Sequence, residues 1–110
     1  MSTVSPSQTD RPSRTDRRTR TALLPLGHVV ATPGALDAAR EHGVNVVALL
    51  HRHRRGDWGD LSAHDARAND RAADDGDGRV LSSYETRAGR IWVITEADRS
   101  STTVLLPSEY

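Results

Sequence analysis

The stretch "RVLSSYETRAGRIWVITEADRSSTTVLLP", residues 79–107, decides the fold class. Three β-branched and aromatic segments, "RVLSSYE", "GRIWVITE" and "STTVLLP", are separated by the turn-forming links "TRAG" and "EADRS". This pattern predicts a meander of three antiparallel strands. On the middle strand Ile91, Val93 and Thr95 share one face, while Trp92 and Ile94 share the other. Both faces are therefore expected to be covered, which makes this strand central.

One more strand and three helices are expected before the meander. "GHVVAT", residues 27–32, is short and β-branched, as strands often are. Three apolar-periodic segments follow, each opened by an N-cap residue and closed near glycine. They run from Thr32 to Gly43, from Asn45 to Gly56, and from Ser62 to about Ala73. The order predicts an α+β domain: a small antiparallel sheet, made of the N-terminal strand and the three-strand meander, with two or three helices packed on one face.

Length and composition predict one folded domain with a polar tail. The chain has 110 residues, which suits a single core. Residues 1–22 are rich in Arg, Ser, Thr and Pro and have little to bury, so we expect a disordered tail before a single α+β domain over residues 23–110. There is no cysteine, and no apolar run is long enough for a membrane span. A cytoplasmic protein without membrane contact is expected.

Charge is unevenly distributed along the chain. All fifteen basic residues are arginine, and the formal net charge is zero. Five of these arginines and only two aspartates lie in residues 1–22, so the domain itself is mildly acidic. A domain of this charge is not expected to hold nucleic acid by bulk electrostatics, although the Arg-rich tail could contact phosphates.

The strongest candidate site is "HRHRRGDWGDL", His51 to Leu61. The two histidines are two apart on the expected helix, about 200° around its axis, so they cannot share one metal ion, and no metal site is predicted. His53 and Asp57 could instead form the oriented imidazole–carboxylate pair of a general base. Basic residues in a last helical turn also complement the helix dipole, so an ordinary helix end remains the alternative.

Trp58 lies between two glycines in the same stretch. It is either a plug over the core or the anchor of an interface, where Trp and Arg are enriched. Arg52 and Arg55 beside it favour an interface. Arg54 is the candidate for stabilising phosphate charge if the site is catalytic.

A second polar cluster, "ITEADRSSTT", lies at a turn between strands. Thr95, Glu96, Asp98 and Arg99 could bind a phosphate, although such residues also build ordinary turns. Ser82 and Tyr84 alternate with Leu81, so their hydroxyls face away from that leucine and form a polar cleft if this face meets His53. There is no Walker loop, dinucleotide fingerprint or nucleophile elbow, and no cofactor is predicted.

Four blocks carry a family resemblance: "LGHVVATPGAL", "GDWGDL", "RVLSSY" and "IWVITEADRSSTTVLLPSEY". Over residues 24–110 the chain resembles short bacterial proteins of plasmids and other mobile elements that are commonly labelled "type I restriction endonuclease subunit M" or "plasmid-related protein". The resemblance implies a role associated with mobile elements. It carries over no catalytic residue. The chain also lacks the Gly-rich loop and the base-binding motif that a methyltransferase needs, so no methyltransferase activity is expected.

Two functions compete on this evidence. The first is a small accessory binding or regulatory protein that acts on a protein partner through Arg52, Arg55 and Trp58, with Thr95, Glu96 and Asp98 as further contacts. The second is a metal-independent ribonuclease-like enzyme, with His53 as general base. In the enzyme, Arg54 or Arg99 would stabilise phosphate, and Asp57, Ser82 and Tyr84 would complete the site.

Overall fold

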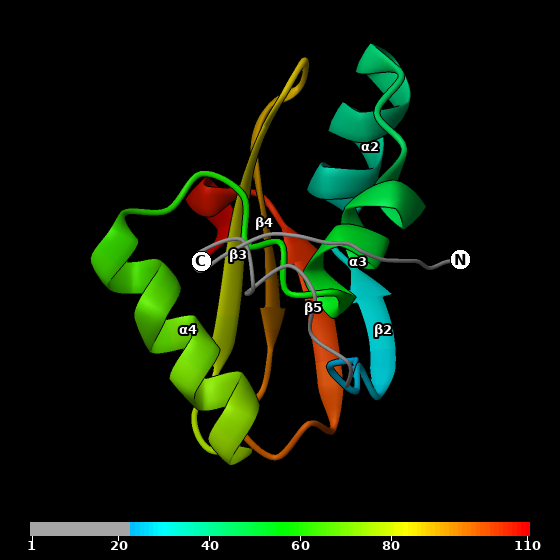
Figure 1. Ribbon diagram of the computed structural model, residues 1–110. Coiled ribbons are helices and arrows are strands. Elements are labelled where there is room, and N and C mark those ends of the chain that lie inside the picture. Colours follow the sequence, from blue (N-terminus) through cyan, green and yellow to red (C-terminus); the bar gives the residue numbers. More distant parts are fainter. Residues whose placement is uncertain (1–22) are drawn as a thin grey trace, which may run out of the picture.

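The computed structural model describes residues 23–110 (Figure 1). The tail predicted over residues 1–22 lies outside the described residues. The elements follow the predicted order, one strand, three helices and three strands, and a short 3-10 turn closes the chain. They are β2 (His28–Ala31), α2 (Pro33–His42), α3 (Val46–Arg54), α4 (Ala63–Asp75), β3 (Val80–Thr86), β4 (Gly89–Thr95), β5 (Ser101–Leu105) and η2 (Pro107–Glu109). The α+β class is confirmed.

Each helix begins at the predicted N-cap. The side chains of Thr32, Asn45 and Ser62 accept hydrogen bonds from N–H groups in the first turns of α2, α3 and α4. These bonds satisfy donors that the helix cannot pair internally. Gly43 and Gly76 end α2 and α4 in the left-handed conformation, which costs glycine little.

The four strands form one sheet in the order β2-β5-β4-β3. Strands β3, β4 and β5 make the predicted antiparallel meander with β4 inside it. The expectation that the whole sheet is antiparallel was wrong, because β2 pairs with β5 in parallel. Strand β2 feeds directly into α2, and the N–H of Thr32 at this junction bonds to the carbonyl of Val104 in β5. The sheet is therefore mixed, and β2 lies at its edge.

All three helices contribute to the core on one face of the sheet (Figure 1). Ala35 of α2 and Leu49 of α3 pack with the β3 and β4 side chains Tyr84 and Ile91. Ala66 of α4 belongs to a second apolar cluster under β3. On the opposite face, β4 contacts η2, and the rings of Trp92 and Tyr110 meet edge to face.

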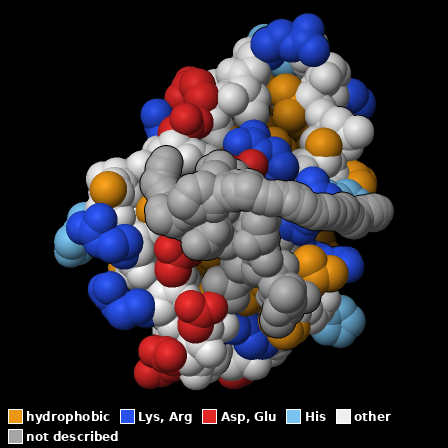
Figure 2. All heavy atoms as spheres, viewed as in Figure 1, with side chains coloured by type: hydrophobic (Ala, Val, Ile, Leu, Met, Phe, Trp, Pro, Cys, Tyr) orange, Lys and Arg blue, Asp and Glu red, His pale blue; other side chains and the backbone are white. Residues whose placement is uncertain are grey.

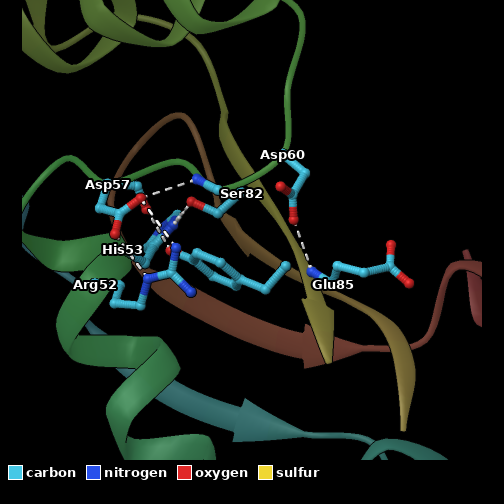
Figure 3. Close-up of polar contacts among 8 residues, drawn as sticks. Arg52, His53, Asp57, Asp60, Ser82 and Glu85 are labelled. Carbon is cyan, nitrogen blue, oxygen red and sulfur yellow. Dashed lines mark hydrogen bonds and ion pairs between the residues drawn. The ribbon is translucent and has the colours of Figure 1, made fainter. Parts of the chain in front are cut away.

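The free edge of β3 is covered by other parts of the chain. The side chain of Asn69 in α4 donates to the carbonyl of Leu81 and accepts from its N–H. Next along the strand, Ser83 bonds through its N–H to the carbonyl of Trp58 and through its carbonyl to the N–H of Asp60. The Asp60 carboxylate then accepts from the N–H of Glu85 (Figure 3). These contacts satisfy backbone groups that an edge strand otherwise leaves unpaired.

Candidate functional site

The sequence stretch His51–Leu61 forms the end of α3 and the loop that crosses to β3. Basic residues fill the last turn of α3, as the helix dipole favours. The loop turns at Gly56 and Gly59, both with positive φ. A Cβ on Gly59 would collide with the carbonyl oxygen of Ser83, so only glycine lets the loop approach β3 this closely.

His53 points from α3 into the core and has no exposed surface. Its Nδ1 lies 2.6 Å from the hydroxyl of Ser82 on β3, and its Nε2 lies 2.8 Å from the hydroxyl of Thr95 on β4 (Figure 3 shows the first contact). The sequence left open whether the face that carries Ser82 meets His53, and in the structure it does. The expected meeting of His53 with Asp57 was not, because hydroxyl groups occupy both ring nitrogens.

A chain of hydrogen bonds fixes the direction of every proton around His53. The hydroxyl of Thr102 donates to the carbonyl of Leu26, which can only accept. Thr102 must then accept from Thr95, which lies 2.7 Å away. The hydroxyl oxygen of Thr95 in turn accepts from Nε2–H of His53, and Nδ1 accepts from Ser82. A neutral imidazole satisfies all these partners at once.

The electrostatics of His53 agree with this neutral form. Burial disfavours the charged imidazolium and lowers the pKa of His53 from 6.5 to about 4. A general base must reach the proton that it removes, directly or through one water. His53 has no exposed surface and no free ring nitrogen, so the arrangement serves packing and not proton abstraction.

The residues predicted to assist His53 are also engaged with the protein. Asp57 accepts two hydrogen bonds from the guanidinium of Arg52, at 2.7 and 3.3 Å (Figure 3). The hydrogen bond with Asp57 is also the main cause that raises the pKa of Arg52. Arg52 lies over the ring of Tyr84, 4.5 Å from its centroid. The buried Tyr84 hydroxyl donates to the Asp57 carbonyl, and burial raises the pKa of Tyr84.

Trp58 is a plug over the core. Only 3% of its surface is exposed, and its indole N–H donates to Asp70 of α4 at 2.9 Å. Its ring meets that of His53 edge to face. The hypothesis that Trp58 anchors an interface was wrong, because its ring faces the protein interior. Thr95 is likewise fully buried, so neither residue can touch a partner directly.

Arg99 holds backbone segments together at the turn between β4 and β5. Its guanidinium donates to four carbonyls, those of Ala72, Gly78, Glu96 and Ala97. Its own φ of 62° is uncommon for a residue other than glycine. These contacts fit the ordinary-turn alternative for Arg99, because its guanidinium is used to join backbone segments.

The remaining predicted site residues lie at or near the surface and do not converge on one site. Glu96 forms an ion pair with Arg79. Asp98 accepts from the N–H of Ser100, and hydrogen bonds from Ser100 lower the pKa of Asp98. Arg54 and Arg55 are exposed at the end of α3. The stretch "ITEADRSSTT" therefore contains an ordinary turn between β4 and β5, which describes the structure better than a phosphate site does.

The sequence interpretation predicted strand β2 but did not predict that its valines are exposed. Val29 and Val30 are 46% and 51% exposed, although valines on a strand usually face the core. A signal was available in the sequence: residues 22–36 contain no charged side chain, in a protein where 27% of residues are charged. Edge strands are commonly protected by charges, so this uncharged run marks an unprotected edge.

No helix within residues 23–110 is long and apolar enough to cross a membrane. In the same part of the chain, no three His, Asp or Glu side chains group closely enough to hold a metal ion. The chain matches no protein-family model, and no curated protein or solved structure matches it.

Proposed function

We propose that this chain is a small accessory binding protein of bacterial mobile genetic elements that acts in the cytoplasm on a protein partner. The association with mobile elements rests on the resemblance of the four sequence blocks. The binding role rests on the exposed apolar surface around β2.

The observation that carries the proposal is the contrast between the two edges of the sheet. The β3 edge is covered by Asn69 and by the loop over residues 58–60. No comparable cover lies on the β2 edge among the described residues. Besides Val29 and Val30 of β2, Leu36 of α2 and Val47 of α3 are exposed apolar residues.

These side chains fit a binding surface. Figure 2 shows hydrophobic side chains at the surface along the side formed by α2, α3 and β2. An exposed edge strand offers main-chain donors and acceptors to an added strand, and apolar side chains beside it supply contact area. A protein or peptide partner in extended conformation is the ligand that such an edge recognises.

The ribonuclease alternative receives less support from the same structure. It needs an accessible His53, whereas this residue is fully buried between two hydroxyl groups. Purified full-length chain is therefore expected to leave RNA intact in EDTA. Cleavage that disappears in His53→Ala would overturn this expectation.

Site-specific photocrosslinking in a bacterial host tests the binding role. A photoreactive amino acid at Val30 is expected to form covalent adducts with protein. The same group at Ala63, exposed at the start of α4, is the matched control and should form none. Equal adduct yields at the two positions, or no adduct at Val30, would refute a binding surface at β2.

A further inference from the structure

The open edge of β2 presents a defined pattern of backbone donors and acceptors. Beside β5, the N–H of His28 donates to the carbonyl of Ser100, just before the strand, and the N–H of Thr32 donates to the carbonyl of Val104 within it. Backbone N–H and C=O groups of consecutive residues in a strand point to opposite sides, so those of every second residue point the same way. The N–H and C=O groups of Val29 and Ala31 therefore point away from β5. No residue among 23–110 provides them with a partner.

The outward groups are arranged symmetrically about Val30. An antiparallel copy of β2 placed with Val30 opposite its own equivalent sets Val29 opposite Ala31 on both sides of the symmetry axis. Each Val29–Ala31 pair exchanges two hydrogen bonds, so the N–H and C=O groups of both outward residues are satisfied in both chains. An identical strand is thus complementary to this edge without any change of backbone.

We propose that β2 pairs with β2 of a second copy of this chain, joining two four-stranded sheets into one continuous sheet across a two-fold axis at Val30. The inference deepens the proposed function and rests on it, because it names the partner of the same edge. A two-fold interface of this kind uses one patch on both subunits.

Charge supports a second copy as the occupant. Residues 22–36 contain no Asp, Glu, Lys or Arg, and the formal net charge of the whole chain at pH 7, with His neutral, is zero, so like-charge repulsion does not oppose the approach of two copies. The Arg-rich stretch over residues 1–22 offers a poorer strand. It contains two prolines and five arginines, whereas β2 contains neither residue type.

Opposite charges at Val30 test the symmetry directly. Val30 is about half exposed in the single chain, so Glu or Lys there should leave the fold intact, which circular dichroism checks. In the pair, the two residues at position 30 lie about 4.5 Å apart between Cα atoms. Full-length Val30→Glu and Val30→Lys should each weaken self-association at least about tenfold, as measured by sedimentation equilibrium.

Mixing the two variants shows whether association is weakened by like charges facing each other at the axis or by the loss of the valine side chain. An equimolar mixture of Val30→Glu and Val30→Lys should regain association, because opposite charges then face each other across the axis. Ala63→Glu adds the same charge beside the β3 edge and should associate like the wild-type chain. Val29→Pro, which removes one outward N–H and none of the bonds to β5, should weaken association without unfolding the protein.

Two outcomes overturn the inference, and they have different consequences for the proposed function. A wild-type chain that stays monomeric up to about 1 mM has no self-pairing edge. If the crosslinker at Val30 still captures a different protein, the binding function stands and only the occupant was wrong. If it captures nothing, both proposals fail. A dimer that is insensitive to charge at Val30 would place the interface elsewhere.

Discussion

His53→Gln is the most informative substitution in the core. Glutamine supplies an N–H donor and a carbonyl acceptor, as the neutral imidazole of His53 does for Thr95 and Ser82, but it does not titrate. The variant should therefore keep the buried hydrogen-bond chain and lose one source of pH dependence.

The size and sign of this pH dependence follow from the pKa of His53. In the folded protein it is about 4, against an ordinary value of 6.5 that we take for the unfolded chain. Between these values the unfolded chain binds a proton that the folded protein does not, so stability decreases as pH falls. For this single group, the loss is about 2 kcal/mol at pH 5 and approaches about 3 kcal/mol below pH 4.

Urea unfolding followed by tryptophan fluorescence measures the effect. Free energies of unfolding are compared for the wild-type chain and His53→Gln between about pH 7.5 and pH 4.5. Carboxylates contribute equally to both proteins, so the difference between the curves isolates His53. The wild-type curve should fall more steeply towards low pH. Parallel curves would refute a buried neutral imidazole at this position.

Three further substitutions test contacts that hold the sheet edge and the turn. Asn69→Asp keeps the acceptor for the Leu81 N–H but loses the donor to its carbonyl, and should lower the free energy of unfolding by about 1–3 kcal/mol in urea titrations. Gly59→Ala should cost more than about 1 kcal/mol, because a Cβ there meets the Ser83 carbonyl and φ is positive. Arg99→Gly relieves a strained φ but removes the bonds to four carbonyls. It should lower Tm in thermal unfolding, and a higher Tm would show that backbone strain dominates.

Local signals in the sequence predicted the elements of the fold well. Helix starts depend on one side chain and the next few N–H groups, so Thr32, Asn45 and Ser62 were recognisable without tertiary structure. The meander was equally local, because short links force neighbouring strands to pair. The partner of β2 was not predictable in this way. Its pairing with β5 spans most of the domain and depends on where three helices return the chain.

The candidate site was harder to predict because residue type does not reveal solvent exposure. His53, Ser82 and Thr95 were candidate site residues in the sequence, and the structure brings them together. The sequence pattern did not show that the space between them is fully buried. Trp58 illustrates the same difficulty, since a tryptophan between glycines suits both a core plug and an exposed anchor. The bond from its indole to Asp70 decides for the plug.

The buried polar chain has a structural role that an active site would not need. His53 of α3 binds hydroxyls on β3 and β4, and Thr102 extends the chain through β5 to the carbonyl of Leu26. A one-residue slip of β3 that brought Leu81 to the position of Ser82 would leave Nδ1 of His53 without a donor. Such an unsatisfied buried group costs about 1–3 kcal/mol, whereas an apolar core at these positions would carry no such penalty. The polar residues therefore favour one strand register and one position of α3. In the sequence alone they resemble a catalytic cluster.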